Sequence, residues 1–171
     1  MTAYAITKFL YDYELHEDGE LLCYVENFDS VISIVKYIFD NILSVYDQLK
    51  CEDYYFAEYT IYKTHGLNSG LVSYDLLKSS RFPKLELCIG LKTKSYRYLL
   101  SLEGDNHMKE ILLEKIDGLK DFLDYAKLIN SKDHKALKDI CRESGLIISL
   151  FSCKSKIIRL LLLNKLKKIQ S

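Results

Sequence analysis

Residues 3–26 read AYAITKFLYDYELHEDGELLCYVE, and the first half of this stretch alternates between two kinds of side chain. One face carries Ala3, Ala5, Thr7, Phe9, Tyr11, Tyr13 and Leu15, while Lys8, Asp12 and Glu14 lie on the other. A period of two predicts a half-buried β-strand over 3–15. Asp18-Gly19 is typical of a tight hairpin turn, so residues 20–26 are predicted as the antiparallel return strand.

A long amphipathic helix is predicted after this hairpin. Asn27 or Asp29 can cap its N-terminus, and apolar residues recur at helical spacing over 28–49. Residues 54–63 (YYFAEYTIYK) then form a predicted strand that is apolar on both faces. A strand of this kind is expected near the centre of a sheet.

The rest of the chain adds a second hairpin and then helices. The pattern of residues 71–79 is ambiguous, and a short helix can form there. Alternating patterns over 85–91 and 96–102 predict two strands with a polar turn at Thr93-Lys94. Further helices are predicted over 106–129, from Ser131 to near Gly145, and within 146–169, the last of them largely buried. The order predicts one α+β domain over 1–171. Its antiparallel or mixed sheet has about five strands, an N-terminal ββαβ unit and then a hairpin, packed with C-terminal helices.

The composition is that of an ordinary globular protein. The chain has 171 residues, a formal net charge of zero, 49% hydrophobic and 28% charged residues, which excludes disordered and low-complexity classes. Five cysteines without a close pair indicate reduced core thiols and a cytoplasmic protein. The N-terminus lacks a signal-peptide pattern, and Lys154, Lys156 and Arg159 interrupt the most apolar stretch. We therefore expect no membrane partner.

The sequence contains no persuasive catalytic or metal-binding set. Nucleotide-binding glycine motifs and CxxC are absent, and no two histidines lie at i, i+4, so we expect no metal and no cofactor. His65, Ser69 and Asp75 form a trio that any globular protein offers by chance, and Asp75 with Glu86 lacks the lysine of a metal-dependent nuclease. The sequence favours a protein without catalysis and assigns no catalytic residue. An unusual enzyme stays open as an alternative, with His65 the first residue to mutate.

The zero net charge hides a segregation along the chain. Residues 1–60 hold 12 acids and 3 bases, a net of −9, and residues 61–171 hold 12 acids and 21 bases, a net of +9. Ten of the 14 tyrosines lie in the first 62 residues. Such asymmetry informs on partners rather than on fold.

The acidic, tyrosine-rich half predicts a protein-binding face. Its predicted members are Tyr11, Asp12, Tyr13, Glu14, Glu17, Asp18 and Glu20, and Asp47, Glu52 and Asp53 add further acids near the end of the first helix. Such a face can engage a basic protein or imitate the charge of a nucleic acid, and a merely solvated acidic face is the alternative. We expect a non-enzymatic interaction protein with a protein partner. The excess of lysine over arginine, 20 to 4, suggests an AT-rich phage, virus or mobile element, and hence an inhibitor or an anti-defence or immunity-type factor.

A basic segment supports an alternative function, a nucleic-acid-binding module. Residues 78–97 carry Lys78, Arg81, Lys84, Lys92, Lys94 and Arg97 against Glu86. Cations on a hairpin can follow a phosphate backbone. Tyr96 and Tyr98 are predicted on the core face, which argues against base stacking, and an edge hairpin that is merely solvated would look similar. A homodimer is compatible with either function.

Overall fold

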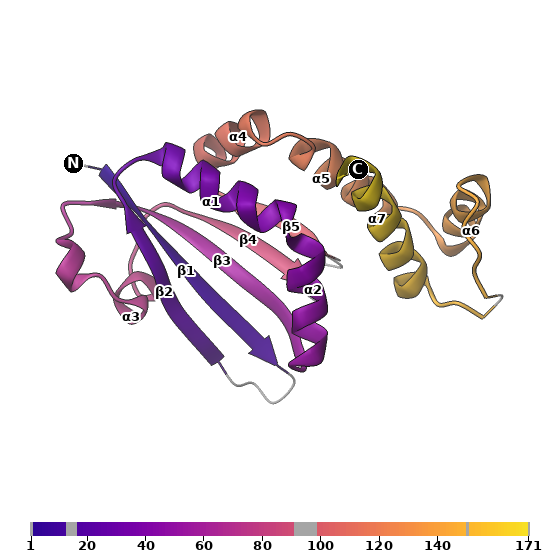
Figure 1. Cartoon of the computed structure of the whole chain (residues 1–171), viewed down its shortest axis with the longest axis horizontal. Coiled ribbons are helices and arrows are strands. Elements are labelled where there is room, and N and C mark those ends of the chain that lie inside the picture. The colour runs from indigo at the N-terminus through magenta and orange to yellow at the C-terminus, as the bar shows by residue number, and fades with distance from the viewer. Residues whose placement is uncertain (1, 13–16, 91–98, 150, 171) are drawn as a thin grey trace.

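Five antiparallel strands form a sheet in the order β2-β1-β3-β4-β5 (Figure 1). The computed structural model describes residues 2–12, 17–90, 99–149 and 151–170, the side chains of residues 17, 18 and 50 excepted. The strands are β1 (Thr2–Asp12), β2 (Glu17–Val25), β3 (Tyr54–His65), β4 (Lys84–Gly90) and β5 (Leu100–Gly104). This sheet confirms the predicted α+β fold.

The central strand is β3, as its apolar faces predict. Its Ile61 lies between Ile6 of β1 and Leu85 of β4, and all three side chains are at most 1% exposed. Alternation along each strand sends these residues into the main core. The core is therefore built on one face of the sheet.

The helical elements are α1 (Phe28–Asp40), α2 (Ile42–Cys51), the 3₁₀ turn η1 (Ser69–Leu71), α3 (Tyr74–Lys78), α4 (Asn106–Lys115), α5 (Leu119–Asn130), α6 (His134–Glu143) and α7 (Lys154–Gln170). The short helix α3 packs on the opposite face of the sheet, where Leu77 meets Ala5 and Tyr62. Figure 1 shows α1 and α2 across the sheet, with α5, α6 and α7 beyond it. Both α4 and α5 contact β5, while α7 packs on α5 and α6.

The first hairpin is confirmed, but its predicted turn is wrong. Asp18 and Gly19 lie within β2, where they pair with Leu10 and Phe9. A Cβ at Gly19 would come within 2.1 Å of the ring of Tyr74 in α3. Glycine at this position therefore permits the close approach of α3, and it does not form a turn. The residues that connect β1 to β2, 13–16, lie outside the described part of the chain.

Two predicted helices are each divided. The helix over 28–49 breaks at Asn41, whose side-chain amide donates to the carbonyl of Tyr37 at 2.9 Å. The helix over 106–129 breaks before Gly118, which has a φ of +82° that glycine adopts readily. The last helix, predicted within 146–169, runs from Lys154 to Gln170. Residues 91–98, including the predicted turn at Thr93-Lys94, lie outside the described residues.

The C-terminal helix is buried as predicted. Ile157, Ile158, Leu161, Leu162 and Leu166 are each at most 2% exposed. Within the described part of the chain, no helix combines the length and apolar content of a membrane span. The prediction of core thiols is confirmed for two cysteines, because Cys88 and Cys141 are buried, while Cys51 and Cys153 are exposed.

A substitution at Gly90 tests the close approach of β3 and β4. Its φ is +115°, and a Cβ there would lie 2.3 Å from the carbonyl oxygen of Tyr55. We expect Gly90→Ala to lower the free energy of unfolding by about 1–3 kcal/mol because it forces strain or separation of β3 and β4. The measurement is urea unfolding followed by circular dichroism. The control is Gly70→Ala, whose Cβ would meet Asn68 at 3.6 Å. Equal stability of the two variants would contradict this account of Gly90.

Candidate functional site

The face of the sheet opposite α1 and α2, here called the open face, is only partly covered. The short helix α3 packs over one part of it, where Leu77 meets Ala5 and Tyr62. The Lys78 ammonium of the same helix lies 5.4 Å from the centre of the Phe9 ring. Toward the end of the sheet near the first hairpin, half-buried aromatic side chains form the surface of this face.

These side chains form the aromatic cluster, which consists of Phe9, Tyr11, Tyr55 and Phe56. Tyr11 of β1 pairs with Phe56 of β3, and the two rings stack with centroids 5.2 Å apart and planes 15° apart. A register shift after Tyr11 pairs Asp12 with Tyr54 and leaves Tyr55 as an extra residue. Such a bulge re-aims a side chain, and the Tyr55 ring lies 5.9 Å from that of Tyr11.

Acidic residues gather at the same end of the sheet. The acidic end is defined by Asp12, Glu20, Asp47, Glu52 and Asp53. β1 ends at Asp12, opposite the start of β3, while α2 and the turn after it supply Asp47, Glu52 and Asp53. Those three side chains and Glu20 are exposed. Figure 1 shows α2 ending at the end of the sheet where β1 ends and β3 begins.

The turn from α2 into β3 depends on an unusual backbone conformation. Asp53 has a φ of +62°. Aspartate tolerates this left-handed region better than most residues, because its short polar side chain can bond locally. The tight turn starts β3 directly after α2, so Glu52 and Asp53 immediately precede Tyr54, which pairs with Asp12 at the end of β1.

Carboxylates also occur on the open face itself. Glu58 pairs with Phe9 on one side and Cys88 on the other, and Glu86 lies opposite Glu103. The pKa of Tyr62 is raised, first by burial and then by neighbours that include Glu86 and Glu58. The pKa of Tyr59, on the core face, is raised by burial and then by Glu20. Negative charge therefore acts on both faces of the sheet, on Tyr59 from the core side and on Tyr62 from the open face.

The structure describes only part of the predicted protein-binding set. Tyr11 joins the aromatic cluster, Asp12 ends β1, and Glu20 pairs with Lys8 in the register of β1 and β2. The backbones of Glu17 and Asp18 begin β2 at the acidic end. Tyr13 and Glu14 lie outside the described residues.

The basic segment is likewise described in part. Lys78 contacts the rings of Phe9 and Tyr74, and the Lys84 ammonium lies 3.2 Å from the Glu86 carboxylate. Arg81 is exposed in the segment that leads into β4. Lys92, Lys94 and Arg97 lie outside the described residues. The structure therefore associates two of the three described cations with aromatic or acidic neighbours on the open face.

The histidine combinations considered from the sequence have separate surroundings. His65 ends β3 and its ring lies 3.3 Å from the hydroxyl of Thr2, whereas Ser69 begins η1 and Asp75 lies in α3. His134 contacts the carbonyl oxygen of Ser152 at 2.9 Å. Cys141 is buried, and burial raises the pKa of its thiol. Among the described residues, no group of three or more potential ligands is arranged to hold a metal ion.

Sequence reasoning missed the contribution of β3 to this surface. Tyr55, Phe56 and Glu58 were considered only as members of a central strand that is apolar on both faces. The pairing of Tyr11 with Phe56 places them beside the first hairpin. The dense aromatic run at 54–56, directly after Glu52 and Asp53, was the available signal.

Comparison with known proteins identifies no relative. No protein-family model, no curated protein and no solved structure matches the chain.

Proposed function

We propose that this chain is a non-enzymatic interaction protein that binds a basic protein partner through the acidic end and the aromatic cluster. One observation carries the proposal. The antiparallel register pairs Tyr11 with Phe56 and Asp12 with Tyr54, so two acidic segments far apart in sequence meet around stacked aromatic rings. Aromatic side chains supply contact area and exposed carboxylates accelerate association with a cationic surface.

The open face favours a cationic protein over a nucleic acid. Glu58, Glu86 and Glu103 share this face with the aromatic side chains, and carboxylates repel phosphate. Lys84 is paired with Glu86 at 3.2 Å, which reduces its availability to a phosphate. Binding of nucleic acid by the basic segment stays a prediction, and the following experiment also tests it.

The test is affinity capture from a nuclease-treated lysate with the full chain immobilised at low salt and at several-fold higher salt. We expect a protein of high isoelectric point to be retained at low salt and released at high salt, because the attraction is between exposed charges. In a second arm, fluorescence anisotropy measures binding of single-stranded RNA, single-stranded DNA and duplex DNA. Tight, salt-dependent binding of a nucleic acid, together with no specific protein capture, would contradict the proposal.

The proposal extends to inhibition of the protein that this chain binds. An acidic surface that covers a cationic substrate-binding site would block that site by competition. If the captured protein has an activity, we expect the full chain to reduce it in proportion to occupancy. Full activity of the saturated complex would contradict inhibition and leave the binding function intact.

A further inference from the structure

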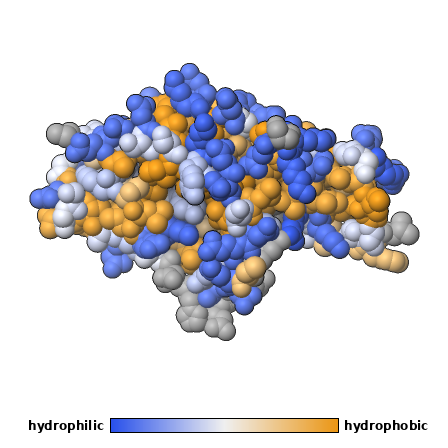
Figure 2. All heavy atoms as spheres, viewed as in Figure 1, coloured by the Kyte–Doolittle hydropathy of each residue, from blue (hydrophilic) through white to orange (hydrophobic). Residues whose placement is uncertain are grey.

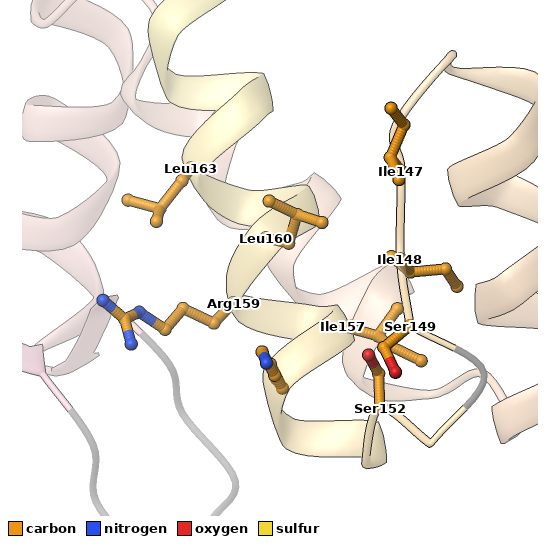
Figure 3. Close-up of a pocket in the computed structure, with 9 residues that line it drawn as sticks. Ile147, Ile148, Ser149, Ser152, Ile157, Arg159, Leu160 and Leu163 are labelled. Carbon is orange, nitrogen blue, oxygen red and sulfur yellow. The ribbon is translucent and has the colours of Figure 1, made fainter.

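A groove of about 290 Å³ lies between α7 and the segment that joins α6 to α7 (Figure 3). The two helices beside it, α6 and α7, lie beyond one edge of the sheet (Figure 1). None of its lining residues belongs to the acidic end, although Arg159 contacts Tyr46, the neighbour of Asp47 in α2. In the same view of the surface, apolar side chains appear among polar ones over this C-terminal region (Figure 2). Its volume is at the small end of the range for small-molecule sites.

The two ends of the groove differ in chemistry. Ile147 and Ile148 lie along one wall and Leu160 points toward them from α7, as Figure 3 shows. The hydroxyl groups of Ser149 and Ser152 lie together further down, beside the first turns of α7. A ligand that follows the groove therefore meets an aliphatic wall at one end and hydroxyl groups at the other.

The polar end also carries positive charge. Lys156 is exposed and lines the groove, and Lys154, also exposed, begins α7 two residues before it. α7 has 17 residues, and its N-terminal end carries the positive end of the helix dipole. The Ser155 hydroxyl and then the backbone N–H of Lys156 lower the pKa of the Cys153 thiol, so this turn stabilises negative charge.

Arg159 also lines the groove, but its guanidinium points away from Ser149 and Ser152 (Figure 3). Its guanidinium lies 5.1 Å from the centre of the Tyr46 ring. The buried Nε of Arg159 has no hydrogen-bond partner among the described residues.

We propose that this groove binds an anionic amphiphile with one medium-length hydrocarbon chain, such as a fatty acid. The carboxylate lies at the end formed by Ser149, Ser152 and Lys156, and the chain follows Ile148, Leu160 and Leu163. Charge complementarity selects an anion over a neutral or cationic headgroup. The aliphatic wall supplies affinity through burial of the hydrocarbon chain.

Decanoate and decanol test the headgroup, because they share a chain and differ in charge. Each is titrated into the full chain below its micelle or solubility limit, with binding followed by calorimetry. We expect saturable binding of decanoate and at least about tenfold weaker binding of decanol. Equal affinities, or no saturable binding of decanoate, would overturn the proposal.

Single substitutions test whether decanoate binds in this groove. Lys156→Glu at the polar end and Leu160→Glu in the wall are each expected to weaken decanoate binding at least about tenfold. Lys167→Glu is the matched control, because it reverses an exposed cation near the other end of α7 and should leave the affinity unchanged. A uniform loss in all three variants would overturn the assignment to the groove. Sedimentation that shows a wild-type dimer dissolved by Leu160→Glu would assign the groove to a second copy instead.

Discussion

Phe122→Ala is expected to lower the free energy of unfolding by about 3–5 kcal/mol. Phe122 is fully buried in α5, and its ring centroid lies 6.3 Å from that of Phe39 in α1. The contact joins the C-terminal helices to the helices that cover the sheet. Truncation removes apolar contact and leaves a cavity that the surrounding core fills only in part.

The matched control for this truncation is Leu128→Ala in the same helix. Leu128 is 50% exposed, so its loss should cost within about 1 kcal/mol. Urea unfolding of both variants, followed by circular dichroism, gives the comparison. Equal destabilisation would contradict the role of Phe122 as a link between the two groups of helices.

Local patterns were sufficient for most of the fold. Alternation over 3–15 and 85–91 predicted β1 and β4, because a strand with one buried face requires that spacing. The run over 54–63, apolar on both faces, predicted the central strand β3. The buried helix near the C-terminus was also predicted from its apolar residues. The divisions at Asn41 and Gly118 were missed because helical periodicity continues across both residues. Both are residues that commonly end helices, so the signal was present but weaker than the periodicity.

Long-range contacts explain what sequence reasoning could not predict. Asp18-Gly19 has the chemistry of a turn, yet Gly19 is needed because Tyr74 of α3 packs against it. The meeting of Asp12 with the residues that precede β3 depends on the register of β1 and β3. The position of Tyr55 depends on a bulge in that pairing. Charge counting identified the acidic half of the chain, but only the register shows which acids share one end of the sheet.

Reversal of charge at the acidic end is expected to weaken binding of the captured partner by at least about a hundredfold. The variant is Glu20→Lys, Asp47→Lys and Glu52→Lys. All three side chains are exposed, so the substitutions remove three attractive charges and introduce three repulsive ones without disturbing the core. The melting temperature should therefore stay close to that of the wild-type chain.

The matched control reverses three exposed acids elsewhere. Glu110→Lys and Glu114→Lys lie in α4, and Glu143→Lys lies in α6. The control produces the same change in net charge, so it separates a local surface from a general electrostatic effect. We expect its affinity for the partner to stay within about threefold of wild type.

The dissociation constant of the captured partner, measured by calorimetry for the wild-type chain and these two variants, tests the central claim most directly. We expect a large loss of affinity for the acidic-end variant and near wild-type affinity for the control. Equal affinities for the two variants would contradict a partner-binding role of the acidic end and the aromatic cluster.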